Sequence, residues 1–140
     1  MNRMFPVVLL ALACGTQSFQ ITEISPEDVL SAPPSTLILD VRSPEEFASG
    51  HVPNAVNIPH DELATRLTEL QDFRSAPVVV YCERGGRAGK AALVLTNSGF
   101  SHIRHLTGDM SGWRKQNLPV DASSSVGSEN IPSVAPLKSS

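Results

Sequence analysis

The residues most suited to carry out chemistry are a cysteine and two arginines in one short loop. Cys82 follows an apolar run at residues 78–81 and precedes two glycines, Arg87 and an alanine-rich segment. A thiolate is a nucleophile, but a free cysteine, with a pKa of about 8.5, is mostly protonated at neutral pH. Loop amides, a helix N-terminus and the guanidinium groups of Arg84 and Arg87 would all favour the thiolate. The same groups would bind an anion above Cys82.

The segments on either side of Cys82 predict where it stands in a fold. Residues 78–81 (VVVY) are typical of a buried strand, and the alanine- and leucine-rich residues 88–95 are typical of a helix. Cys82 therefore lies at the carboxyl end of a strand, where parallel α/β sheets bind their ligands. The alternative is an inert, buried cysteine that only packs. The arginines, the glycines and the helix start favour the nucleophile.

Strands and helices alternate along the rest of the chain. Ser25 and Ser43 are predicted helix N-caps, each followed by a proline, and Glu46 completes a capping box with Ser43. Gly99 is the expected C-cap of the helix that follows the loop. Other expected elements are strands at residues 19–24, 37–41, 56–59 and 103–106, and helices at 61–70 and 113–115. We predict an α/β fold with a mostly parallel central sheet and helices on both faces.

Composition excludes several classes of function. The chain has 140 residues, enough for one domain, and a formal net charge of -3 with 5% aromatic residues. That balance predicts no nucleic-acid binding. The two cysteines, Cys14 and Cys82, form no C-x-x-C pair, and His60, His102 and His105 have no metal-ligand arrangement. We therefore expect no metal site.

The N-terminus predicts export. Residues 1–13 (MNRMFPVVLLALA) place Arg3 before an apolar run that is too short to span a bilayer, which needs about 20 residues. A buried N-terminal core segment is the alternative. Residues 10–15 (LALACG) resemble a bacterial lipobox, with Ala11 where leucine is usual. Cys14 is then either lipidated or left with a free thiol after ordinary cleavage. We expect an exported protein, periplasmic or membrane-anchored by a lipid on Cys14.

The loop around Cys82 resembles the active-site loop of rhodanese-domain sulfurtransferases, C-x-x-G-x-R-[AS]. The matching residues are Cys82, Gly85, Arg87 and Ala88. The resemblance implies that this cysteine carries a sulfane sulfur as a persulfide. Protein tyrosine phosphatases and arsenate reductases have five residues between cysteine and arginine, whereas residues 83–86 make four here. The shorter loop favours the sulfur-transferring type.

Two further segments carry the resemblance. Residues 39–55 resemble the first rhodanese signature, with Asn54 where glycine is usual, and asparagine tolerates the same turn conformation. Residues 106–113 resemble the closing signature L-x-G-G-x-x-x-W, with Asp109 in place of the second glycine. An acid there bears on anion affinity and substrate preference. The resemblance covers about residues 19–120 and implies the rhodanese-like three-layer fold.

The resemblance and the loop chemistry together give each candidate residue a role. Cys82 is the expected nucleophile. The expected substrate-binding residues are Glu83, Arg84, Gly85, Gly86, Arg87 and Ala88. Asp40 and Arg42 are expected to support the site structurally, and His51 to be a satisfied structural histidine rather than a general base. The Glu83 carboxylate beside the thiolate would oppose the arginines.

The expected reaction moves a sulfane sulfur from thiosulfate or a similar anionic donor, through a Cys82 persulfide, to cyanide or a thiol acceptor. It needs no cofactor, and a thioredoxin-like reductant is a further candidate partner. One alternative is a persulfide-carrying module that delivers sulfur to a protein partner with little turnover of small donors. Another is a phosphatase-like or arsenate-reducing enzyme with a shortened loop. We divide the chain into a signal peptide (1–13), a linker (14–18), a rhodanese domain (19–120) and a disordered tail (121–140).

Overall fold

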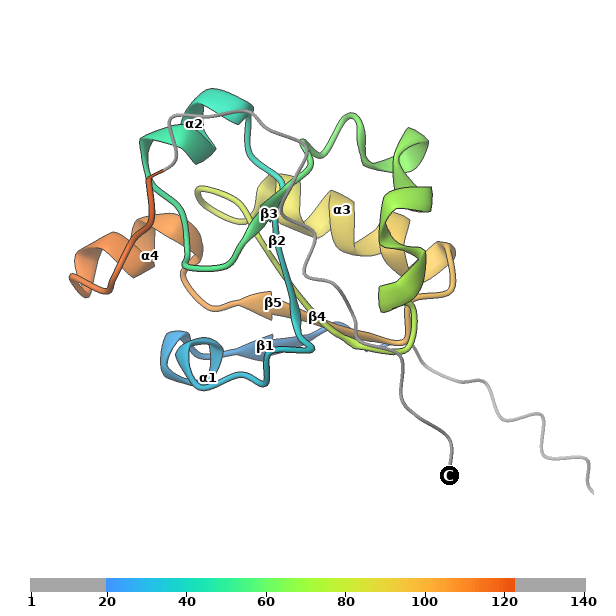
Figure 1. Cartoon of the computed structure of the whole chain (residues 1–140), viewed down its shortest axis with the longest axis horizontal. Helices are drawn as coiled ribbons and strands as arrows, with labels where there is room; N and C mark the ends of the chain where they lie inside the picture. Colours follow the sequence, from blue (N-terminus) through green and yellow to red (C-terminus); the bar gives the residue numbers. More distant parts are fainter. Residues whose placement is uncertain (1–19, 123–140) are drawn as a thin grey trace, which may run out of the picture.

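The computed structural model describes residues 20–122 and contains one five-stranded, all-parallel sheet (Figure 1). The strands are β1 (Thr22–Ile24), β2 (Leu37–Asp40), β3 (Val56–Asn57), β4 (Pro77–Tyr81) and β5 (His102–Leu106). Their order is β1-β5-β4-β2-β3, so the strand before Cys82 occupies the centre. The predicted α/β class is confirmed, and the sheet is wholly rather than mostly parallel. The predicted signal peptide, Cys14 and most of the predicted tail lie outside the described residues.

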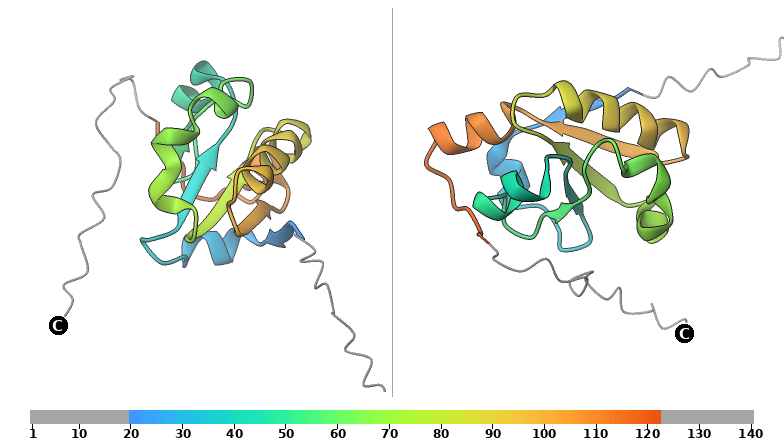
Figure 2. Two further views of the ribbon diagram at one scale, coloured as in Figure 1. Left: turned by 90° about the vertical axis from the view of Figure 1, so that its right-hand side faces the viewer. Right: turned by 90° about the horizontal axis from the view of Figure 1, so that it is seen from above.

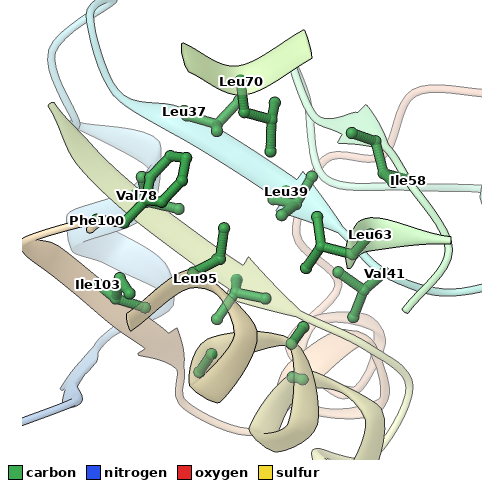
Figure 3. Packing of buried hydrophobic residues seen from close by; sticks show 14 of the residues in the cluster. Leu37, Leu39, Val41, Ile58, Leu63, Leu70, Val78, Leu95, Phe100 and Ile103 are labelled. Carbon is green, nitrogen blue, oxygen red and sulfur yellow. The ribbon is translucent and has the colours of Figure 1, made fainter. Parts of the chain in front are cut away.

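Helices cover both faces of the sheet. The α-helices are α1 (Pro26–Leu30), α2 (Pro44–Ser49), α3 (Gly86–Asn97) and α4 (Asp109–Lys115), and two 3₁₀ helices are η1 (Leu63–Thr65) and η2 (Leu67–Phe73). On one face, α3, η1 and η2 enclose a core cluster that includes Leu39, Val80 and Leu95 (Figure 3). On the other, α1 and α4 pack Val29 and Trp113 into a second cluster. Figure 2 shows the resulting three layers from two further sides.

The helix starts follow the local signals in the sequence. Ser25 Oγ accepts the Asp28 N–H at 3.2 Å, which caps α1. Ser43 Oγ accepts the Glu46 N–H at 3.2 Å, and Glu46 Oε1 accepts the Ser43 N–H at 3.3 Å, so the predicted capping box is present. These bonds satisfy first-turn amides that a helix leaves without partners.

Three element predictions need correction. The helix expected at residues 61–70 is the 3₁₀ pair η1 and η2, because Leu67, Leu70 and Phe73 recur every three residues, which is the repeat of a 3₁₀ turn. The final helix starts at Asp109 rather than near Trp113, since its early amides find acceptors on the loop after β4. The first strand begins at Thr22, so the described residues 20 and 21 of the predicted strand lie outside it.

The described chain ends in contact with the domain. Asp121 forms an antiparallel bridge with His51, with N–O distances of 2.9 and 3.0 Å, although the sequence assigned Asp121 to the tail. Within residues 20–122, no helix is long and apolar enough to cross a membrane.

The central strand fixes the position of the candidate site. Val78, Val79, Val80 and Tyr81 have no exposed surface, as expected for a strand covered on both faces. Asp40 at the end of β2 lies in register with Tyr81. Cys82 follows at once, so the two strand ends bring Asp40, Arg42 and Cys82 to the same edge of the sheet.

Candidate active site

The Cys82 thiol lies where the central strand passes into α3. Cys82 is buried, and the Gly85 N–H donates to its Sγ at an N–S distance of 2.9 Å. Gly85 has a φ of 113°, a left-handed conformation that glycine adopts without strain. The next amides, of residues 86–88, start α3 and have no acceptor within it. This arrangement stabilises negative charge on the sulfur or on an anion bound beside it.

Asp109 forms a hydrogen bond with the backbone of Cys82. Its Oδ1 accepts the backbone N–H of Cys82 at 3.0 Å and lies 2.9 Å from His105 Nε2. An ionised carboxylate only accepts hydrogen bonds, so the imidazole is the donor. The hydrogen bond to Asp109 raises the pKa of His105 above its ordinary value. Asp109 is 4% exposed and has a φ of 53°, which aspartate tolerates better than most residues.

This His105–Asp109 pair is the part of the site that sequence reasoning missed. Asp109 was recognised only as a departure from the closing signature, and His105 was considered only as a metal ligand and given no role in the site. The two residues are four positions apart, but they belong to different elements, β5 and α4, so neither a helix nor a strand pattern predicts their contact. The available signal was an acid at a glycine position of a signature that flanks the active-site loop.

The two loop arginines differ in their surroundings. Arg87 donates from Nη1 and Nη2 to the two carboxylate oxygens of Glu46, at 2.6 and 3.0 Å. These bonds lower the pKa of Glu46 to about 2 and raise that of Arg87. Arg84 is exposed and has no ion-pair partner within residues 20–122. Arg84 is therefore the loop cation whose charge remains available to an anionic ligand.

Asp40 and Arg42 form a buried ion pair beside the loop. Arg42 Nη2 donates to Asp40 Oδ2 at 2.7 Å and to the Gly50 carbonyl at 2.8 Å, and both side chains are fully buried. Arg42 Nη1 also lies 3.4 Å from Glu83 Oε2. The pair joins the end of β2 to the loop after α2 and to the cysteine loop.

Glu83 does not face the thiolate as an isolated charge. Arg114 on α4 donates to both of its carboxylate oxygens, at 2.5 and 3.1 Å, and these bonds lower the pKa of Glu83. With Arg42 on the other side, the Glu83 carboxylate is neutralised by two guanidinium groups. The Glu83 carbonyl also accepts the Ser111 N–H at 3.1 Å, so loop and α4 are held together at backbone level as well.

His51 lies near this edge of the sheet in a packed setting. Its Nδ1 is 2.8 Å from the Phe47 carbonyl oxygen, and its ring stacks on Phe47 with centroids 3.6 Å apart. Next to it, the Val52 N–H donates to the Tyr81 hydroxyl at 3.1 Å. Burial raises the pKa of Tyr81, so its hydroxyl stays protonated. These contacts give His51 and Tyr81 bonds within the scaffold that supports the loop.

Known proteins are similar to this chain in sequence and in fold. The rhodanese-like domain family matches residues 25–116. The chain is 36% identical over 94 residues to thiosulfate sulfurtransferase 16, chloroplastic, of Arabidopsis thaliana, covering 60% of this chain and 78% of the relative. It is 30% identical over 105 residues to a sulfurtransferase of Allochromatium vinosum, covering 73% and 96%. A solved rhodanese-related protein from Thermoplasma volcanium superposes with a TM-score of 0.65 at 28% identity, covering 73% of this chain and 99% of that one. The chain therefore belongs to the rhodanese-like domain family and is related to thiosulfate sulfurtransferases.

Proposed function

We propose that this protein is a sulfurtransferase that carries a sulfane sulfur on Cys82. The observation that carries the proposal is the bond from the Gly85 N–H to Cys82 Sγ at the start of α3, in a loop of the rhodanese pattern. A thiolate held in this way is a nucleophile without needing a neighbouring general base. The two relatives named above, both sulfurtransferases by name, support the same class of reaction.

The reaction has two balanced steps. The Cys82 thiolate attacks the outer sulfur of thiosulfate, the bond between the two sulfurs of the donor breaks, and sulfite leaves with the electron pair. Cys82 then bears a persulfide anion with the same charge as the original thiolate. In the second step cyanide attacks the outer sulfur of the persulfide, which gives thiocyanate and restores the thiolate. A thiol acceptor takes the sulfur in the same way, as its own persulfide.

We assign donor binding to the loop and its one unpaired cation. Thiosulfate is a dianion, and the Arg84 guanidinium together with the amides of residues 86–88 would hold its sulfonate oxygens. Arg87 acts by shaping the loop, since its charge is shared with Glu46. Asp40 and Arg42 support the end of the sheet. No step in this scheme uses a metal ion or an organic cofactor.

A sulfur-carrying module is the second candidate, because three of the four arginines around the site are already paired with carboxylates. Such a site attracts small dianions less strongly and suits delivery to a protein thiol, for example of a thioredoxin-like partner. Steady-state kinetics with thiosulfate and cyanide separate the two candidates. Parallel lines in double-reciprocal plots, the ping-pong pattern, and rapid turnover support the enzyme. Persulfide formation followed by transfer only to a protein thiol supports the carrier.

Two single substitutions test the assignment of the thiol. Cys82→Ser should abolish turnover, because a serine hydroxyl is barely ionised at neutral pH and forms no persulfide. Cys14→Ser is the matched control, since it removes the other cysteine of the chain and should leave turnover unchanged. Residual turnover in Cys82→Ser would refute the proposed function.

We further propose that the protein acts outside the cytoplasm. The support is the sequence of residues 1–13 and the lipobox-like residues that follow, which lie outside the described structure. Fractionation of cells with the native chain should recover a form lacking residues 1–13 from the periplasm or the membrane. If Cys14 carries a lipid, Cys14→Ser should move the protein into the soluble fraction. A cytoplasmic form that retains Met1 would contradict the proposal.

A further inference from the structure

The carboxylate of Asp109 places a negative charge very close to the sulfur-carrying thiol. Its Oδ1 lies 3.0 Å from the backbone nitrogen of Cys82, which puts it within about 7 Å of the sulfur of the same residue. A charge at that distance opposes both a thiolate and an approaching anion. An acid behind the nucleophile of an enzyme for anionic donors therefore requires compensation.

His105 is placed to provide that compensation. Its Nε2 is 2.9 Å from the Asp109 oxygen that binds Cys82, and its side chain is 26% exposed while that of Asp109 is 6% exposed. The pair also abuts the loop itself. A Cβ on Gly85 would lie 3.2 Å from Asp109 Oδ2 and 3.3 Å from His105 Cε1. The pair thus packs directly against the residue whose amide binds the sulfur.

Among the groups around His105, Asp109 is the acidic partner that forms a hydrogen bond with its imidazole. Glu23 on β1 lies in register with His105, and its negative charge raises the pKa of His105 less than Asp109 does. On the β4 side the partner in register is the apolar Val80. From the loop, the neighbour is Gly85, which has no charge. His105 is therefore the cationic partner of Asp109 that lies against the loop.

We propose that His105 and Asp109 are a positioning pair that determines how well the site accepts anionic sulfur donors. The Asp109 carboxylate fixes the backbone of Cys82, and the His105 imidazolium cancels the carboxylate charge. With His105 protonated the pair is neutral. When His105 loses its proton the pair carries one negative charge beside the sulfur, and anionic donors such as thiosulfate are disfavoured relative to uncharged reagents. The proposal rests on Cys82 as the sulfur carrier, as proposed above.

The geometry of Asp109 agrees with a role beyond packing. The backbone at position 109 has a φ of 53°, which glycine adopts with the least strain, and glycine is the usual residue at this position of the closing signature. The chain instead has a buried acid that requires a partner for its charge. Because its pKa is raised, His105 stays protonated to a higher pH than an isolated histidine does, and the pair stays neutral over the same range.

Two alkylating reagents test the proposal without relying on sulfur transfer. Iodoacetate is an anion and iodoacetamide is neutral, and both react with the same thiolate, so the ratio of their rates cancels the ionisation of Cys82. The full chain is alkylated, and the modification of Cys82 is then measured by mass spectrometry of the peptide that contains it. The iodoacetate-to-iodoacetamide ratio should fall roughly threefold to tenfold between about pH 6 and about pH 9, as expected for one added charge at this range.

Three variants separate the charges while preserving hydrogen-bonding groups. At every pH, His105→Gln should show the low iodoacetate-to-iodoacetamide ratio that the wild type shows only at high pH, because the charge of the carboxylate is never compensated. In the double variant Asp109→Asn with His105→Gln the pair has no charge. This variant should show, at every pH, the high ratio that the wild type shows only at low pH. Asp109→Asn alone, which keeps an acceptor for the Cys82 N–H and tolerates positive φ, should exceed the wild-type ratio at low pH. His102→Gln, an exposed histidine of the same strand, is the matched control and should not change the profile.

The outcomes distinguish this proposal from the proposed function. A His105→Gln profile that keeps the wild-type pH dependence, or a double variant that equals His105→Gln, overturns the role of the pair. If His105→Gln does not fold, the Asp109→Asn profile decides, and a ratio equal to that of the wild type at low pH overturns it. The rate of sulfur loading from thiosulfate should follow the same order among the variants. If the alkylation ratios behave as expected but thiosulfate never loads Cys82, the proposed function fails and the charge pair stands.

Discussion

Replacing Glu46 by glutamine should destabilise the fold by about 1–2 kcal/mol at neutral pH, because it removes the ion pair between α2 and α3. The hydrogen bonds from Arg87 lower the pKa of Glu46 from 4.5 to about 2. At about 1.36 kcal/mol for each pKa unit, this difference of roughly 2.5 sets an upper limit of about 3.4 kcal/mol. The side chains of Arg87 and Glu46 are 31% and 34% exposed, so solvent screens the pair and roughly a third to a half of that limit remains.

The stabilisation by Glu46 should depend on pH in one direction. Because its pKa is depressed in the folded state, the contribution is fully present above the unfolded-chain value and is lost as the pH falls from about 4.5 to about 2. Urea unfolding should therefore separate Glu46→Gln from the wild type at neutral pH, and the two should converge near pH 2. Glu45→Gln is the matched control, since Glu45 is exposed in the same helical turn. Equal stabilities at neutral pH, or a difference that persists near pH 2, would refute this reasoning.

Three further substitutions test other parts of the site. Arg84→Ala should raise the KM for thiosulfate roughly threefold to tenfold without changing the unfolding free energy, and an unchanged KM would exclude Arg84 from donor binding. Arg42→Ala should lower the free energy of unfolding by about 3–5 kcal/mol, because the Asp40 carboxylate would stay buried without its cation; a loss below about 1 kcal/mol would contradict this. Tyr81→Phe should cost about 1–3 kcal/mol, because the Val52 N–H loses its acceptor in the core, and an unaltered thermal midpoint would show that the bond contributes nothing.

The features that the sequence predicted well are those that depend on neighbouring residues. The Ser43 capping box spans four residues, and both of its hydrogen bonds are present. The apolar run at residues 78–81 was expected to be buried on both faces, and it is the central strand of a parallel sheet. Gly99 after α3 has the positive φ of 90° expected after a helix end. Local backbone preference and periodicity were sufficient for these elements.

The features that the sequence did not predict depend on residues brought together by the fold. Arg87 was assigned to the thiolate, but its direct partner is Glu46, 41 positions earlier, on a helix whose packing no local pattern defines. Asp109 reaches Cys82 across 27 positions because α4 begins against the cysteine loop. The 3₁₀ geometry of η2 was also missed, since apolar spacings of three and four residues overlap with those of an α-helix.

The most direct test of the central claim is the mass of the protein after thiosulfate treatment. If Cys82 is the sulfur carrier, thiosulfate alone should add about 32 Da, one sulfur atom, and the addition should map to the Cys82 peptide. Cyanide should then remove it with formation of thiocyanate. The Cys82→Ser protein, still folded, should gain no mass. An adduct on Cys14, or an unchanged mass of the wild-type chain under conditions in which it turns over thiosulfate, would contradict the assignment of Cys82 as the nucleophile.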